Sequence, residues 1–155
     1  MARRVFFSFR YKNDNWRAGV VRNSWVCKGH DVAGFFDSAE WEKVKRKDDN
    51  EIKKWIDLQL EGTSVTVVLI GSDTYNKKWI NYEILSSCKR GNGILGIYVH
   101  NIRNRFGSRA SKGKNPFDYW DWSKTKYGVP KVYDWVNDNG YNNIGKWIEI
   151  AASIK

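Results

Sequence analysis

The stretch "SVTVVLIGSDTYNKKWINYEI", residues 64–84, decides the fold. Its first eight residues are almost continuously apolar, which is typical of a strand that is covered on both of its faces. The polar turn "SDTYN" follows, and Ile80 and Ile84 then recur at the spacing of a helix. A covered strand that leads through a short turn into a helix is the repeating unit of a parallel α/β sheet.

The same alternation extends along the chain. Three further apolar runs predict strands: "RVFFSF" (4–9), "DVAGFFD" (31–37) and "ILGIYVH" (94–100). Four apolar stripes predict helices: Trp16, Val20, Val21 and Trp25; Ile52, Trp55, Ile56 and Leu60, behind the possible caps Asp48 and Asp49; Ile80, Ile84 and Cys88; and Ile144, Trp147, Ile148, Ala151 and Ala152. Alternating strands and helices predict right-handed crossovers and a parallel sheet. Residues 101–130 read as a loop-rich insertion before a last strand, "PKVYDW".

Composition indicates one folded domain over residues 1–155. With 41% hydrophobic residues and nine tryptophans, the chain can bury a substantial core without disulfides. Cys27 and Cys88 fit no metal spacing, so we expect them to be buried, reduced thiols. No apolar run approaches 18 residues, and the start turns polar after one strand length, so the sequence predicts a cytoplasmic protein without a membrane span.

The net charge of +10 is compatible with a nucleic acid, an anionic small ligand, an acidic protein partner or plain solubility. Most of the basic residues are spread along the chain. One stretch, "NIRNRFGSRASKGKN", concentrates them and has the Gly, Ser and Asn content of a surface loop. Its basic residues are Arg103, Arg105, Arg109, Lys112 and Lys114.

Several classes of enzyme are disfavoured by the motifs. The chain has neither GxxxxGK[ST] nor a GxGxxG that opens a helix, so no P-loop or dinucleotide-binding fingerprint supports those classes. A hydrolytic triad is poorly supported, because His30 and His100 are the only histidines and the chain has no G-x-S-x-G nucleophile elbow. The acids that could bind a metal are explained more simply as turn and cap residues. The nuclease-like spacing of Glu51 and Lys53 falls inside a predicted helix, where alternate side chains point apart.

Glu83 is the residue that the predicted fold places where ligands bind. Open parallel sheets bind ligands beyond the carboxyl ends of their strands, and the helix that carries Glu83 starts just past such an end. Trp79 lies four residues earlier, on the same side of that helix. A single carboxylate there could hold a ribose and oppose positive charge on its anomeric carbon. A nicotinamide nucleotide suits a one-acid site, because its leaving group departs as a neutral amide, whereas ordinary glycosidases need paired carboxylates.

At these residues the sequence resembles TIR domains, and over nearly its full length it resembles the TIR-like proteins of the bacterial Thoeris anti-phage system. "RVFFSFRYKND" resembles the first TIR box, and "GFFDSAEWE" lies where the family has its second strand and BB loop. "SVTVVLIGSDTYNKKWINYEI" resembles the third strand and the helix that ends on the family's catalytic glutamate. The resemblance implies a flavodoxin-like, three-layer α/β sandwich with a central, mostly parallel sheet.

The resemblance also implies an activity, namely cleavage of NAD with release of nicotinamide and cyclisation of the remaining ADP-ribose into a signal for a separate effector. NAD is then a substrate, and no further cofactor is expected. Glu83 takes the catalytic position and Trp79 that of the tryptophan before it. The implied substrate-binding residues are Ser8, Phe9, Arg10, Tyr11, Asp37, Ser38 and Trp79. Lys77 and Lys78 depart from the family, which often has a small polar residue before the tryptophan.

Three interpretations remain open on the sequence. The first is the NAD-cleaving enzyme, with a phage protein as a possible trigger and a possible homo-oligomer. The second is a non-enzymatic adaptor that recognises a partner through its loops; such modules commonly lack the acid at Glu83. The third, a nucleic-acid-binding protein, rests on charge alone. Arg10 could pair with a nearby acid instead of a pyrophosphate, and Trp79 could belong to the core.

Overall fold

The computed structural model describes residues 3–33 and 42–154. They form a five-stranded sheet in the order β2-β1-β3-β4-β5, and every pair of neighbouring strands is parallel. The strands are β1 (Arg4–Ser8), β2 (Asp31–Ala33), β3 (Val65–Ile70), β4 (Gly93–Tyr98) and β5 (Val132–Asp134). The predicted α/β fold with a parallel sheet is therefore confirmed, and "PKVYDW" does supply the last strand.

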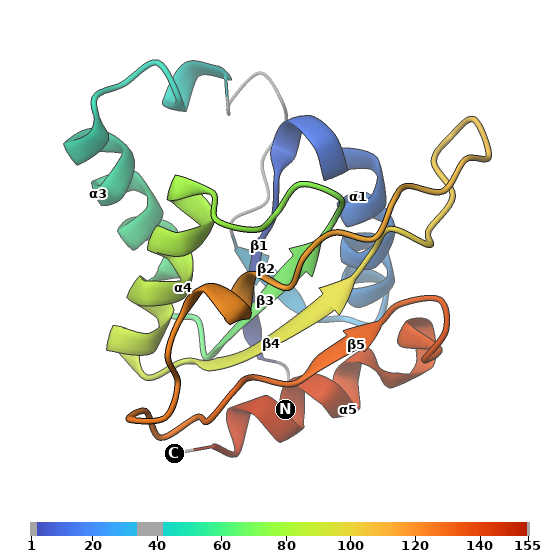
Figure 1. Ribbon diagram of the computed structural model, residues 1–155. Helices are drawn as coiled ribbons and strands as arrows, with labels where there is room; N and C mark the ends of the chain where they lie inside the picture. Colours follow the sequence, from blue (N-terminus) through green and yellow to red (C-terminus); the bar gives the residue numbers. More distant parts are fainter. Residues whose placement is uncertain (1–2, 34–41, 155) are drawn as a thin grey trace.

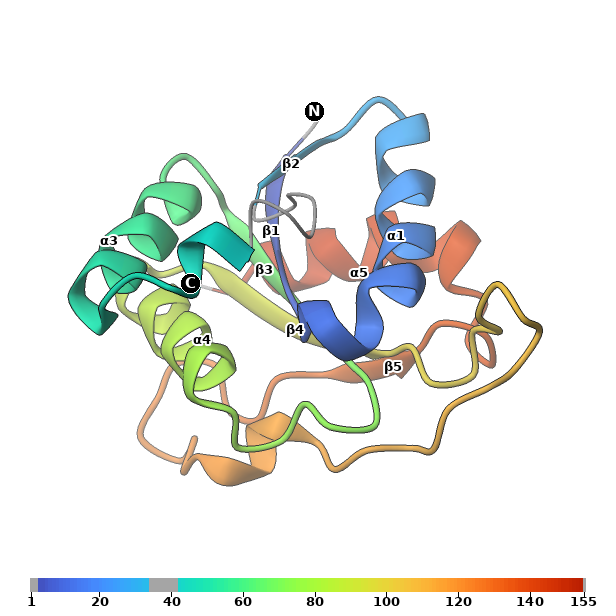
Figure 2. The ribbon, with the colours of Figure 1, turned by 90° about the horizontal axis from the view of Figure 1, so that it is seen from above.

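Helices cover both faces of the sheet. They are α1 (Tyr11–Cys27), α3 (Asp49–Leu60), α4 (Lys78–Arg90) and α5 (Gly140–Ala152), with one short 3-10 helix, η1 (Pro116–Tyr119). Seen from above, α1 and α5 lie on one side of the sheet and α3 and α4 on the other, which makes three layers (Figure 2). We call these two sides the α1/α5 face and the α3/α4 face.

The strands divide their side chains between the two faces with the period of two that a pleated strand imposes. In β1, Val5 and Phe7 pack in the cluster under α1 and α5, whereas Phe6 packs against α3. Ser8 therefore points to the same side as Phe6, toward the α3/α4 face. All six residues of β3 are buried, which agrees with the prediction of a strand covered on both faces.

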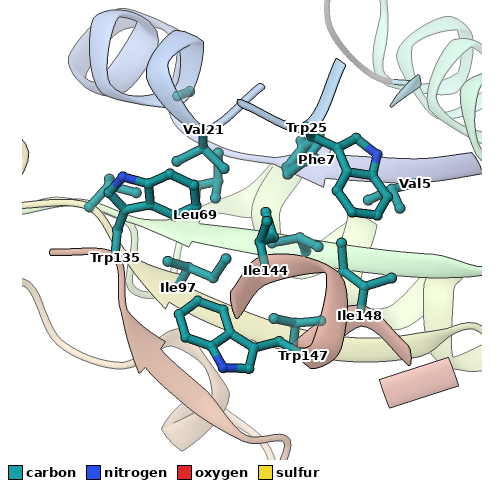
Figure 3. Packing of buried hydrophobic residues seen from close by; sticks show 14 of the residues in the cluster. Val5, Phe7, Val21, Trp25, Leu69, Ile97, Trp135, Ile144, Trp147 and Ile148 are labelled. Carbon is teal, nitrogen blue, oxygen red and sulfur yellow. The ribbon is translucent and has the colours of Figure 1, made fainter. Parts of the chain in front are cut away.

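The α1/α5 face holds the larger core. Figure 3 shows Val21 and Trp25 of α1 and Ile144 and Ile148 of α5 packed over the sheet, with Trp147 of α5 near Ile97. Tyr133 stacks on Trp147, with ring centroids 4.2 Å apart. Gly93 begins β4 beneath α5, where a Cβ atom would lie 2.4 Å from the carbonyl oxygen of Ala151. This close approach explains why the strand enters through a glycine.

The buried stripe of α1 differs from the predicted one. Val21 and Trp25 are buried, but Trp16 is 52% exposed and Val20 is 37% exposed. The helix instead buries the polar residues Asp14, Arg17 and Ser24. The inward face of α1 therefore includes polar positions, and it is rotated relative to the predicted apolar stripe. The prediction of a buried thiol was also wrong for Cys27, which lies exposed at the C-terminal end of α1, whereas Cys88 is half-buried.

The other predicted elements agree with the structure apart from their ends. Asp48 caps α3 by accepting a hydrogen bond from the Glu51 backbone N–H at 2.9 Å. The strand predicted over 94–100 ends at Tyr98, and β2 is described only as far as Ala33. Residues 101–130 carry η1 and are otherwise turns and irregular chain. In the described part of the chain, no helix is both long and apolar enough to cross a membrane.

Candidate functional site

Glu83 lies on the inward face of α4. The helix buries Ile80, Glu83, Ile84 and Ser87, which recur at the i, i+3, i+4, i+7 spacing of one helical face. Ile80 and Ile84 pack against the sheet in an apolar cluster with Val68 of β3. The carboxylate is therefore held inward by the apolar residues that flank it, and Glu83 is only 8% exposed.

Ser8 is the partner of this carboxylate. Its hydroxyl donates a 2.8 Å hydrogen bond to Oε1 of Glu83, and Ser8 itself is fully buried. Ser8 is the last residue of β1, so the bond joins the carboxyl end of a central strand to the second turn of α4. Within residues 3–33 and 42–154, no ion pair to Glu83 is found, so its charge would be opposed only by this hydroxyl and by whatever enters the site.

Burial makes the ionisation of Glu83 unusual. Removal from water raises the pKa of the carboxyl from 4.5 to about 8, and the hydrogen bond from Ser8 lowers it by a smaller amount. An acid with its pKa shifted toward neutral pH, beside a cavity, is a frequent sign of a functional site. Structural carboxyl groups of this kind are usually neutralised by a cationic partner.

A cavity of about 470 Å³ opens beside Glu83 at the carboxyl end of the sheet. Its wall is formed by the loop after β1 and the start of α1, by α3, and by the first turns of α4. The lining residues are Phe9, Arg10, Tyr11, Lys12, Lys45, Trp55, Lys77, Lys78, Trp79, Ile80 and Glu83. Five of these are cationic and four are aromatic, while Glu83 is the single acid among them. Such a surface suits a ligand that carries both phosphates and flat rings.

Arg10 does have the acidic neighbour that the sequence left open. Nη2 of Arg10 lies 3.6 Å from Oδ2 of Asp73, and Nζ of Lys77 lies 3.1 Å from Oδ1 of the same carboxylate. One acid thus bridges the loop after β1 and the loop before α4 at the edge of the cavity. All three side chains are partly exposed, so the bridge is weak and can yield to an anionic ligand.

Trp79 serves both the core and the cavity. It is half-buried, packs against the cluster of Phe6 and Ile56 under α3, and lines the cavity with its remaining surface. Its ring meets Tyr82 edge-on, with centroids 6.0 Å apart, and Tyr82 in turn donates a 2.8 Å hydrogen bond to Asp57 of α3. The two roles that the sequence left open for Trp79 are therefore combined in one residue.

A buried polar network fixes α4 on the sheet. The hydroxyls of Ser87 and Thr66 lie 2.6 Å apart, and Ser87 also donates a 2.7 Å hydrogen bond to the carbonyl oxygen of Glu83. Nδ2 of Asn92 lies 3.3 Å from Oγ1 of Thr66. Because directional bonds tie the helix to β3, the network limits rotation of α4 and holds Glu83 toward Ser8.

The structure brings together six of the eight residues predicted for the site. Phe9, Arg10, Tyr11, Trp79 and Glu83 line one cavity, and Ser8 lies behind it through its bond to Glu83. The positions 37 and 38, at which Asp37 and Ser38 were predicted to bind substrate, lie outside the described residues. No three His, Cys, Asp or Glu side chains gather as a metal-binding group in the parts of the chain that are described.

Sequence reasoning missed six residues of the cavity wall, namely Lys12, Lys45, Trp55, Lys77, Lys78 and Ile80. Lys12 lies in the stretch that resembles the first TIR box and directly follows Tyr11, so its position was available as a signal. Trp55 was assigned only to the apolar stripe of its helix, although it was the one aromatic in that stripe. For Lys45, the sequence offers no signal, because no motif or apolar stripe includes it.

Comparison with known proteins identifies the family of this chain. The family described as "Thoeris protein ThsB, TIR-like domain" matches residues 6–104, which include Ser8 and Glu83. The chain is also 37% identical over 191 aligned positions to a protein of Bacillus cereus (strain MSX-D12) named "Putative cyclic ADP-D-ribose synthase ThsB1". That alignment covers 96% of this chain and 100% of the relative. The chain therefore belongs to the family of Thoeris ThsB proteins with a TIR-like domain.

Proposed function

We propose that this protein cleaves the N-glycosidic bond of NAD, releases nicotinamide and closes the ADP-ribose into a cyclic isomer that acts as an antiviral signal on a separate effector. The observation that carries the proposal is the buried carboxylate of Glu83 in the wall of a cationic, aromatic cavity. The name of the Bacillus cereus relative, which refers to cyclic ADP-D-ribose synthesis, supports the same assignment.

The cavity provides a place for each part of NAD. The first turn of α4 lies in its wall, and the free backbone N–H groups of a helix N-terminus favour phosphate. Arg10 and Lys77 stand at the edge, where a pyrophosphate can replace Asp73 as their partner. Tyr11, which is half-buried and lies against the buried ring of Phe9 with centroids 4.2 Å apart, offers flat surface to a ring of the substrate.

Glu83 acts on the ribose next to the nicotinamide. When the bond from C1′ to nitrogen breaks, its electron pair leaves with nicotinamide and positive charge develops on C1′ and the ring oxygen. An ionised carboxylate at the ribose stabilises that charge, and the dry surroundings strengthen the interaction. The cationic nicotinamide ring of bound NAD also favours the ionised form of Glu83, which opposes the effect of burial on its pKa.

Cyclisation requires that a nucleophilic atom of the ADP-ribose itself, an adenine nitrogen or a hydroxyl of the distal ribose, forms the new bond to C1′ in place of water. The enclosing aromatic side chains, among them Trp55 and Trp79, limit the access of water to this position. Attack by the substrate's own nucleophile gives a cyclic product, whereas attack by water gives linear ADP-ribose. The ratio of these two products therefore measures how well the cavity excludes water.

The test is nicotinamide release from NAD by the purified protein and by Glu83→Gln, which keeps the size of the side chain but removes its charge. We expect the substitution to lower kcat by at least about a hundredfold, the scale of one electrostatic group in a transition state. Glu51→Gln is the matched control, because Glu51 is an exposed acid on α3 away from the cavity wall.

Where the purified wild type is silent, the same three proteins are compared in cells challenged with phage, and nucleotides are analysed by mass spectrometry. Loss of the cyclic product in Glu83→Gln, with a melting temperature at least as high as that of the wild type, supports the proposal. Equal turnover by the wild type and Glu83→Gln contradicts it, and so does the absence of any NAD-derived product in both settings.

A further inference from the structure

A second depression of about 360 Å³ lies on the outer side of α1, next to the loop that follows β4. Its lining residues are Lys12, Asn13, Asn15, Trp16, Arg17, Asn104, Arg105 and Phe106. None of these is acidic. Figure 2 shows the loop, in gold, extending beside the N-terminal half of α1. The proposed reaction uses no part of this depression except Lys12, which lines both cavities.

The loop is anchored to α1 by a buried arginine. Arg17 is 7% exposed and donates hydrogen bonds to the carbonyl oxygens of Ile102, at 2.7 Å, and Ser108, at 2.9 Å. The indole N–H of Trp16 donates to the carbonyl oxygen of Arg103 at 3.3 Å. These hydrogen bonds offset the loss of water around the buried guanidinium, and they fix the path of the loop along α1.

The tip of the loop is held by its own hydrogen bonds. Oδ1 of Asn104 accepts from the backbone N–H groups of Phe106, at 2.9 Å, and Ser108, at 3.0 Å. A guanidinium nitrogen of Arg103 donates to the carbonyl oxygen of Gly107 at 2.9 Å. The side chain of Phe106 is therefore presented outward by an ordered turn and not by a loose chain.

Two aromatic rings stand exposed among positive charges at this place. Phe106 is 78% exposed and Trp16 is 52% exposed, and the guanidinium of Arg105 lies 4.9 Å from the centre of the Phe106 ring. Residues 101–117 contain five basic residues and no aspartate or glutamate. We call the surface formed by Lys12, Trp16, Arg103, Arg105, Phe106 and Arg109 the basic aromatic surface.

We propose that the basic aromatic surface binds single-stranded nucleic acid. Single strands are bound where cations follow the phosphates and exposed aromatic rings stack on the bases. Phe106 and Trp16 supply the rings and Lys12 and Arg105 supply charges beside them, while Arg109, exposed on the same loop, adds a further charge. The side-chain amides of Asn13 and Asn15 can meet the polar edges of a base. An acidic polypeptide would satisfy the charges but would leave both rings without a flat partner.

The position of this surface links it to the candidate active site. Lys12 lies in the first turn of α1 and belongs to the walls of both cavities, while Arg10 and Tyr11 immediately before it face the NAD cavity. A strand that engages Lys12 therefore contacts the helix turn that borders the NAD cavity. The binding itself does not depend on the proposed NAD chemistry and can be tested without it.

Fluorescence anisotropy with labelled 12-nucleotide oligo(dT) and oligo(rU), at 50 to 300 mM salt, measures the binding. We expect Phe106→Ala to weaken it by between about fivefold and a hundredfold, the range of one lost base stack. Phe106→Tyr retains the ring and should bind as the wild type does. Since Phe106 is exposed, neither substitution should change the melting temperature.

The charges are tested with a double variant and a matched control. Arg105→Glu with Arg109→Glu should weaken binding more than tenfold and reduce the slope of log affinity against log salt by about 1.4, which corresponds to two phosphates. Lys54→Glu with Lys146→Glu changes the net charge equally at exposed positions on α3 and α5. Because distant charges are largely screened by salt, the affinity of this control should lie within about twofold of that of the wild type.

Three results would overturn the proposal. The first is equal loss of binding in the two double variants, since it would show a response to net charge alone. The second is unchanged binding by Phe106→Ala, because stacking would then play no part. The third is a labelled 12-residue poly-glutamate peptide that binds as tightly as the oligonucleotides and competes with them, which would assign the surface to acidic polypeptides.

Discussion

The two faces of the sheet are built by different rules. On the α1/α5 face, the strand residues that pack under the helices are apolar, for example Phe7, Val67 and Ile97. On the α3/α4 face, Ser8 and Thr66 also lie on strands beneath a helix and are fully buried, but they are polar. They form hydrogen bonds with Glu83 and Ser87 of α4. One face is optimised for packing and the other retains buried polar groups where a ligand can use them.

This difference indicates where stability and function reside. Apolar side chains in a core must fill the available volume, but they need no hydrogen-bond partner. Each buried polar group needs a hydrogen-bond partner to offset the loss of water. Ser87 and Thr66 satisfy one another, but the carboxylate of Glu83 has a single hydroxyl as its described partner. The α3/α4 face therefore carries a destabilising group that packing alone would not select.

The largest effect is expected from removing volume on the α1/α5 face. Trp25→Ala should lower the free energy of unfolding by about 3 to 5 kcal/mol, because Trp25 is only 2% exposed and its loss leaves a cavity. Urea denaturation measures the change. Trp16→Ala, on the same helix but exposed, should cost less than about 1 kcal/mol. Similar losses for both would contradict the placement of α1.

A smaller effect should follow from exchanging the polarity of neighbouring strand positions. Val67→Thr places a hydroxyl among apolar side chains on the α1/α5 face and should cost about 1 to 3 kcal/mol. Thr66→Val makes the opposite exchange on the α3/α4 face, where Ser87 keeps its bond to the carbonyl oxygen of Glu83. We expect Thr66→Val to lower the free energy of unfolding by about 1 kcal/mol. Urea denaturation of both variants would test whether Val67→Thr is the more destabilising of the two.

The carboxyl of Glu83 should make stability fall as pH rises. Its pKa is raised from 4.5 to about 8 in the folded state, so between these values the folded protein holds a proton that the unfolded chain has lost. In this window the wild type should lose at most about 1.4 kcal/mol per pH unit through this group. Glu83→Gln removes the ionisation and should melt at a higher temperature than the wild type above pH 8.

Melting curves between pH 5 and pH 9 test the sign as well as the size of this effect. The difference in melting temperature between Glu83→Gln and the wild type should grow with pH and then level off. Glu51→Gln, which changes an exposed acid, should show no such trend. A difference that is constant with pH would mean that Glu83 ionises in the folded protein as it does in water.

Much of this architecture could be predicted from the sequence. Near-continuous apolar runs alternate with stripes of helical spacing clearly enough to specify the parallel sheet, and the position of Glu83 after β3 predicted that it lies at the ligand-binding edge. The stripe of α1 could not be predicted correctly, because buried Asp14 and Arg17 interrupt its apolar pattern. An apolar stripe marks the inward face of a helix only where that face is apolar, and the inward face of α1 also holds Asp14, Arg17 and Ser24.

The details of the site depended on contacts between distant parts of the chain. Ser8 and Glu83 are 75 residues apart. Their hydrogen bond requires both that Ser8 points to the α3/α4 face of the sheet and that α4 turns Glu83 inward. Likewise, Asp73 joins Arg10 to Lys77 only because two loops meet at the edge of the sheet. Residue types and local spacing predict which groups are present, but the pairing requires the tertiary arrangement.

The smallest expected effect concerns Ser8 and depends on the proposed NAD-cleaving activity. Its hydroxyl stabilises the ionised form of Glu83, so Ser8→Ala should raise the pKa of that carboxyl further above its ordinary value. If the reaction uses the ionised carboxylate, the rising limb of kcat/KM against pH should move to higher pH by less than about one unit. Turnover at pH 7 would then fall by less than about tenfold.

Ser87→Ala separates this effect from a structural one. It removes a buried hydroxyl from the same helix, but that hydroxyl contacts the backbone carbonyl of Glu83 and not the carboxylate. Both variants should lose some stability, since each leaves a buried polar partner unsatisfied. A shifted pH profile in Ser8→Ala alone identifies Ser8 as the residue that orients and tunes the acid. The same shift in both variants would assign it to loosened packing of α4.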